Sequence, residues 1–197
     1  MIALLSVAGC SGKSGAKMPT YDKNPTPKQR YDVTVVIENA PGPFAVVHGA
    51  VQYDIANMDC LPPAESFSGA QTTPISTFVP IVLKRVNDTT FEGQFALDEL
   101  VDGDYFGRGI CHFKPIGPSF SLKASQAAGD TKFVASRWAN ELEQADQLTT
   151  YYWRASYPRH AKIEDYSDLG SSSPDEYKES VRSELFSVSV RTRKVPE

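Results

Sequence analysis

RYDVTVVIENAPGPFAVVHGAVQYDI, residues 30–55, contains two runs in which apolar side chains alternate with polar ones. In the first half these positions are Tyr31, Val33, Val35 and Ile37, and in the second half they are Val47, Val51, Tyr53 and Ile55. The Ala-Pro-Gly-Pro sequence between the halves is typical of a turn. A period of two indicates strands with one buried face, so this stretch predicts two β-strands.

The same alternation returns in three later runs. The apolar positions are Phe91, Phe95 and Leu97 in one run, Cys111 and Phe113 in the next, and Phe186, Val188 and Val190 in the last. Segments rich in Pro, Gly, Asn and Asp separate the runs. Short strands joined by such turns predict a mainly β chain, folded as an antiparallel β-sandwich.

One or two short helices are expected beside the strands. SSSPDEYKESVRSELF, residues 171–186, combines a serine cap, an early proline and early acidic residues, which predicts a helix from Pro174 to Arg182. RWANELEQADQL predicts a second helix from Arg137 to Leu148. Residues 31–197 are expected to form a single β-sandwich domain.

Composition agrees with a folded domain and excludes one class of partner. A hydrophobic fraction of 41% and an aromatic fraction of 11% are enough for a substantial core. The formal net charge of −4 argues against nucleic acid as a partner, because phosphate binding needs a basic surface. No apolar run approaches the about 20 residues that a membrane-spanning helix requires.

The first residues resemble a bacterial lipoprotein processing site. Val7-Ala8-Gly9-Cys10 matches the lipobox in type and order, which implies that Cys10 carries diacylglycerol. Residues 1–9 are then expected to be a signal-peptide remnant, with a truncated or misassigned start because no Lys or Arg precedes Cys10. Residues 10–30 are expected to be the lipidated cysteine and a flexible tether. Ser11, directly after the cysteine, predicts sorting of the lipoprotein to the outer membrane. The chain would be periplasmic and held to the membrane by lipid; the alternative is a frayed terminus with an accidental cysteine.

The cysteine count then predicts a crosslink. If Cys10 is acylated, Cys60 and Cys111 remain as an even pair, and such a pair is expected to close a disulfide in an oxidising periplasm. Two unpaired buried thiols are the alternative if the lipobox assignment is wrong. Without CxxC spacing, the two cysteines are poor zinc ligands.

Motifs of known enzyme chemistry are missing from the sequence. It contains no GxSxG, HExxH, P-loop or GxGxxG motif, and its three histidines have no ligand spacing. The chain is therefore not expected to be an enzyme or to carry a cofactor.

The segment DELVDGDYFGRG, residues 98–109, is the first candidate for a contact with a partner. It gathers Asp98, Glu99, Asp102 and Asp104, followed by Tyr105, between two predicted strands. Three interpretations remain open: an ordinary solvated turn, a protein-contact loop, and a calcium site at Asp98, Asp102 and Asp104.

TTYYWRASYPRH, residues 149–160, is the second candidate. A continuous strand would place Tyr151, Trp153 and Tyr157 on one face and Tyr152 with Arg154 on the other. Aromatic and arginine side chains favour an interaction hot spot, although a strand packed under a neighbouring element explains them as well.

Two runs carry a further resemblance. PGPFAVVHGAVQYDIANMDC and LVDGDYFGRGICHF, within residues 31–113, resemble small cysteine-paired lipoproteins encoded beside interbacterial toxins of type VI or type IV secretion systems. The resemblance implies a periplasmic immunity protein that binds and inhibits a secreted toxin, with a lipase or phospholipase as the favoured partner. A periplasmic ligand or lipid carrier and an envelope structural lipoprotein are the alternatives.

Overall fold

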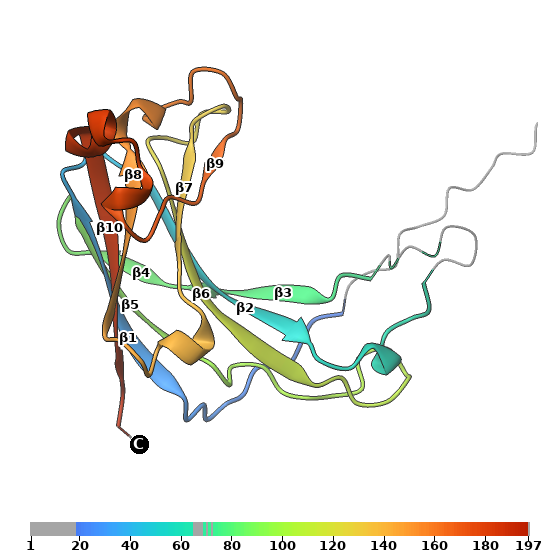
Figure 1. Cartoon of the computed structure of the whole chain (residues 1–197). Coiled ribbons are helices and arrows are strands. Elements are labelled where there is room, and N and C mark those ends of the chain that lie inside the picture. Colours follow the sequence, from blue (N-terminus) through green and yellow to red (C-terminus); the bar gives the residue numbers. More distant parts are fainter. Residues whose placement is uncertain (1–18, 65–68, 70, 72, 197) are drawn as a thin grey trace, which may run out of the picture.

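The computed structural model describes residues 19–64, 69, 71 and 73–196, which form two five-stranded sheets packed face to face (Figure 1). The first sheet has the order β4-β5-β1-β10-β8, with bounds Leu83–Arg85, Thr90–Ala96, Arg30–Glu38, Leu185–Lys194 and Gln147–Trp153. The second has the order β3-β2-β6-β7-β9, with bounds Ser76–Ile81, Val46–Ile55, Phe113–Lys123, Lys132–Ser136 and Ser167–Asp168. The predicted mainly β sandwich is confirmed. All pairings between these strands are antiparallel except the short one between β7 and β9.

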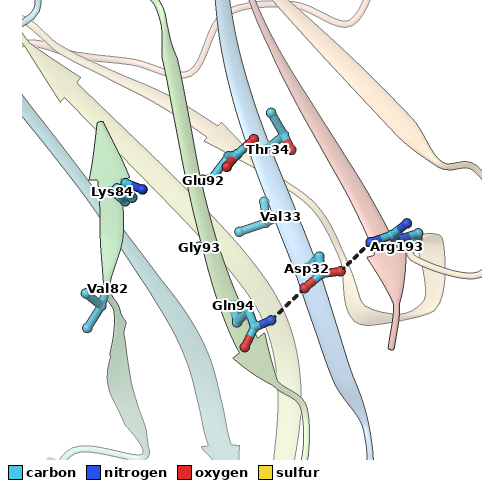
Figure 2. Close-up of a pocket in the computed structure, with 9 residues that line it drawn as sticks. All are labelled: Asp32, Val33, Thr34, Val82, Lys84, Glu92, Gly93, Gln94 and Arg193. Carbon is cyan, nitrogen blue, oxygen red and sulfur yellow. Dashed lines mark hydrogen bonds and ion pairs between the residues drawn. The ribbon is translucent and has the colours of Figure 1, made fainter. Parts of the chain in front are cut away.

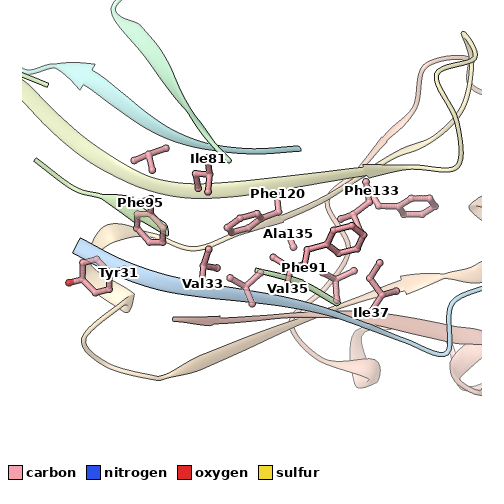
Figure 3. Packing of buried hydrophobic residues seen from close by; sticks show 14 of the residues in the cluster. Tyr31, Val33, Val35, Ile37, Ile81, Phe91, Phe95, Phe120, Phe133 and Ala135 are labelled. Carbon is pink, nitrogen blue, oxygen red and sulfur yellow. The ribbon is translucent and has the colours of Figure 1, made fainter. Parts of the chain in front are cut away.

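The alternation read in residues 31–37 explains the centre of the first sheet. Strand β1 lies between β5 and β10, so that Val35 is opposite Phe91 on one side and Val190 on the other. All three side chains are buried in the core cluster between the sheets (Figure 3). Register is fixed here, because a slip of one residue would turn each apolar side chain outward.

A β-bulge shapes the second sheet. Between Gln52 and Tyr53 the register of β2 shifts against β6, so that Gly117 is opposite Gln52 while Pro115 is opposite Tyr53. Gly117 has a φ of 143°, and a Cβ there would collide with the carbonyl oxygen of Arg137. Glycine is required at this position, and it lets the chain after β7 cross close to β6.

Aromatic rings fill the space between the sheets (Figure 3). The rings of Tyr152 and Phe186 stack with centroids 5.1 Å apart, and Phe133 meets Phe186 edge-on at the same distance. Phe44, which follows the Ala-Pro-Gly-Pro turn, packs against both Phe133 and Phe186. A ligand carried by this fold would therefore have to bind outside the sandwich core.

Both predicted helices are replaced by shorter turns. Ser173 caps as expected, accepting a hydrogen bond from the Asp175 backbone, but the segment splits into the 3₁₀ helices Pro174–Glu176 and Glu179–Glu184. The predicted helix from Arg137 to Leu148 is wrong: only Ala139–Glu141 forms a 3₁₀ turn, and β8 begins at Gln147. The reason is Arg137 itself, whose buried guanidinium binds the carbonyl groups of Glu141 and Ala145 and folds this segment around itself.

Candidate functional site

The acidic segment forms an ordered loop, residues 98–112, between β5 and β6, which we call the acidic loop. Its last part is tied to the 3₁₀ helix Met58–Cys60 by the predicted Cys60–Cys111 disulfide, which is present with a Cα–Cα distance of 5.3 Å. Asn57 adds a second link, since its side chain donates to the Ile110 carbonyl and accepts from the His112 amide. The loop is thus crosslinked at its base.

A small apolar cluster lies under the acidic loop. The two bonded cysteines are buried together with Ile55 and Leu61. The rings of Tyr21 and Tyr105 cover this cluster, with centroids 4.9 Å apart and an edge-on arrangement. The Tyr105 hydroxyl donates to the Val101 carbonyl at 2.6 Å, so this predicted contact residue also holds the loop together.

Each carboxylate of the acidic loop has a partner within the protein. Asp102 accepts from the Phe113 amide at 2.9 Å and lies 2.7 Å from Nδ1 of His112. Asp104 accepts from the Arg108 amide. Glu99 forms an exposed ion pair with Lys23 at 3.1 Å.

Asp98 anchors the segment that was expected to be a tether. Its carboxylate accepts the backbone N–H groups of Lys28 and Gln29 at 2.8 and 3.0 Å. Asn24 pairs with the backbone of Glu99 and donates from its side chain to the Asp98 carbonyl. The chain is therefore packed on the domain before Tyr31, and a flexible tether does not extend through residues 21–30. Cys10 lies outside the described residues.

The predicted calcium ligands do not meet at one point. Asp98, Asp102 and Asp104 bind donors on different segments, and among the residues that the structure describes no three His, Cys, Asp or Glu side chains form a group that could hold a metal ion. Calcium at these residues stays a prediction.

The aromatic side chains of residues 149–160, the second candidate, lie in three different environments. Tyr152 is buried in the core, while Tyr151 and Trp153 lie on the opposite face of β8. Tyr157 does not share their face, contrary to the prediction, because the strand ends at Trp153 and a 3₁₀ turn, Arg154–Ser156, follows. Tyr157 instead packs on Phe44 and donates to the Pro43 carbonyl at 2.6 Å.

Two surface hollows lie on the outer faces of the sheets, and sequence reasoning found neither. The hollow on the first sheet, of about 590 Å³, is drawn in Figure 2. Asp32, one of the two carboxylates that line it, receives hydrogen bonds from Arg193 and Gln94, which keep the pKa of Asp32 below its usual value. These groups satisfy one another, as on an ordinary solvated sheet surface.

The second hollow, which we call the outer groove, also has a volume of about 590 Å³ and crosses the outer face of the second sheet. Large, exposed apolar side chains are part of its lining: Phe78, Trp138 and Leu169 are 60%, 61% and 69% exposed. Phe78 belongs to a strand that the sequence reading missed, and Trp138 lies in the predicted helix that does not form. The apolar run STFVPI, residues 76–81, was the signal for this strand.

Comparisons with known proteins add no relative: no protein-family model, no curated protein and no solved structure matches this chain. Within the described part of the chain, none of the helices has the length and apolar character needed to span a bilayer.

Proposed function

We propose that this chain is a periplasmic immunity protein, held to the outer membrane by lipid on Cys10, that binds and inhibits a secreted antibacterial effector. The effector class to test first is a lipase or phospholipase. One observation carries the proposal: the acidic loop is held in shape by a disulfide, by Asn57 and by its own carboxylates. A loop ordered before binding loses little conformational entropy when a partner arrives.

The surface of the acidic loop supports a protein partner. Met58 and Ile110 are 50% and 52% exposed, on two segments that the disulfide and the Asn57–Ile110 hydrogen bond hold together. The exposed carboxylates of Asp59, Asp102 and Asp104 belong to the same two segments. Exposed apolar side chains with charged neighbours are typical of protein interfaces, and the carboxylates would steer a basic partner surface onto the loop.

Protection of a sensitive strain tests the function. The product of the neighbouring gene, as the candidate toxin, is directed to the periplasm of sensitive cells, with and without this protein, and survival is counted. Survival only with the protein supports the proposal. Equal killing, together with no association of the purified pair at micromolar concentration, would remove it and leave the ligand carrier as the next candidate.

A matched pair of variants tests the contact surface. Ile110→Glu should weaken association with the toxin by about tenfold or more, since a charge would be placed at the centre of the contact. Ile163→Glu is the control, because Ile163 is equally exposed, at 51%, outside the acidic loop. Equal affinities of the two variants would show that the acidic loop is not the contact.

A further inference from the structure

The outer groove is built on a row of side chains that runs across the second sheet. Phe78 on β3 is opposite Gln52 on β2, and Gln52 is opposite Gly117 on β6. Because Gly117 lets residues 137–138 cross close to β6, Trp138 also lines the groove. Two exposed aromatic rings therefore line this hollow, together with short side chains of β6 and β7 such as Ser119, Val134 and Ser136.

Among the described residues that line this hollow, Asp54 is the one carboxylate. Asp54 is half-buried, follows Gln52 on the same face of β2, and is a diagonal neighbour of Phe78 across the β2–β3 pair. Its Oδ1 atom accepts hydrogen bonds from Ser76 at 2.7 Å and from Gln52 at 2.9 Å. These two bonds fix the orientation of the carboxylate, and the residues that the structure describes form no hydrogen bond to its Oδ2 atom.

The negative charge of Asp54 is not neutralised by an ion pair in the described chain. None of the ion pairs found there involves Asp54. Lys114 is its exposed cross-strand neighbour but does not line the groove. Arg137 does line it, yet that residue is 2% exposed and directs its guanidinium to Thr192 and to backbone carbonyls.

We propose that the outer groove binds a small amphiphilic amine, meaning a molecule with one ammonium or guanidinium group on an apolar body. The cationic group would lie against Asp54 Oδ2, and the body would lie between Phe78 and Trp138. The volume of about 590 Å³ is in the range of small-molecule sites. Aromatic faces attract cations as well as apolar groups, so the rings and the carboxylate favour the same ligand. This site is separate from the acidic loop and does not depend on the proposed function.

Tryptophan fluorescence gives a direct test, because the chain contains two tryptophans and Trp138 lines the groove. The Trp153→Phe variant, with Trp138 as its one remaining tryptophan, is titrated with phenylbutylamine, phenylbutanol and phenylbutyrate. These probes share one apolar body and differ in charge. The amine should give a saturable change and bind about tenfold more tightly than the alcohol, with the acid weakest, as expected for a charge-assisted contact in a partly buried site. Equal affinities for amine and acid, or no saturable change with any probe, would overturn the proposal.

Three further variants test whether the charge of Asp54 causes the preference for the amine. Asp54→Asn keeps an oxygen for the Ser76 and Gln52 bonds, so the fold should remain while the preference for the amine disappears. Lys114→Ala removes a neighbouring cation and should strengthen amine binding. Asp88→Asn, in the exposed turn before β5, is the matched control and should change nothing. If Asp54→Asn binds the amine as wild type does, the assignment fails.

A last experiment tests whether the groove binds a small amine or a side chain of a protein partner. N-acetyl-Phe-Lys-amide carries the same kinds of group on a peptide. Binding of this dipeptide about tenfold tighter than phenylbutylamine, and dependent on Asp54, would overturn the small-amine assignment in favour of a protein partner. Weaker binding of the dipeptide supports it.

Discussion

The hydroxyl of Tyr53 on β2 donates a 2.6 Å hydrogen bond to the carbonyl oxygen of Ala96 at the end of β5, and so joins the two sheets through the core. Tyr53 is 1% exposed, and burial raises the pKa of its hydroxyl well above the ordinary value, so the group stays a neutral donor. The bond lies next to the start of the acidic loop. It therefore fixes where that loop leaves the sandwich.

Tyr53→Phe should lower the free energy of unfolding by about 1–2 kcal/mol, because the ring still fills its place while the Ala96 carbonyl loses a buried donor. Urea unfolding followed by circular dichroism measures the change. Tyr166→Phe is the control, since Tyr166 is only partly buried and should change stability by no more than about 0.5 kcal/mol. Equal effects of the two substitutions would contradict a structural role for the Tyr53 hydroxyl.

The Cys60–Cys111 disulfide should contribute about 4 kcal/mol of stability, the chain-entropy value for a closed loop of this length. The Cys60→Ser, Cys111→Ser double variant should therefore melt at a markedly lower temperature than the oxidised wild type. A reducing agent should lower the melting temperature of wild type and leave the double variant unchanged. A peptide map without reduction should show the two cysteine peptides linked; free thiols at both positions would disprove the crosslink.

The sequence predicted strands where one face alone is buried. Val33 and Val35 alternate with polar neighbours because β1 packs on the second sheet with one side and meets solvent with the other. The sequence pattern predicted strand β6 only at its first residue, Phe113, and not over the rest of its length. Its two prolines and the bulge at Gly117 interrupt the alternation, although the strand runs for eleven residues.

Contacts between distant segments could not be predicted from local patterns. Arg137 looks like the start of an amphipathic helix, but its guanidinium is buried and hydrogen-bonded to Thr192 on the other sheet. The acidic residues of the candidate site were identified, yet their partners were not. Asp98 binds backbone amides of residues seventy and sixty-nine positions earlier, a relation that no spacing rule contains.

Asp98→Ala should release the segment before β1. The substitution removes the acceptor of the Lys28 and Gln29 amides, and we expect a loss of about 1–2 kcal/mol because the carboxylate is only half-buried. Hydrogen exchange of these two amides should become faster. Asp104→Ala, which removes one bond within the exposed loop, is the control and should leave both amides protected. Unchanged exchange in the Asp98 variant would contradict the anchoring role.

Asp168 should make the stability of the protein depend on pH. Its side chain lies at the end of β9, is 9% exposed, and accepts a hydrogen bond from the Gly170 amide at 2.9 Å. Burial raises the pKa of this carboxyl above its ordinary value of 3.8, and the effects of Gly170, His160 and Ser156, which lower it, are smaller.

The direction in which stability changes with pH follows from proton binding by Asp168. With a raised pKa the folded state binds the proton of Asp168 more tightly than the unfolded state, so this group stabilises the fold at low pH. That contribution decreases as pH rises from about 3.8 through the folded pKa, because the charged carboxylate is then held in a site that disfavours its charge. Asp168→Asn keeps an acceptor for Gly170 and removes the charge. Its stability relative to wild type should therefore increase with pH when urea unfolding is measured from about pH 4 to 7. Parallel stability curves for the two proteins over this range would show that Asp168 is not the group responsible.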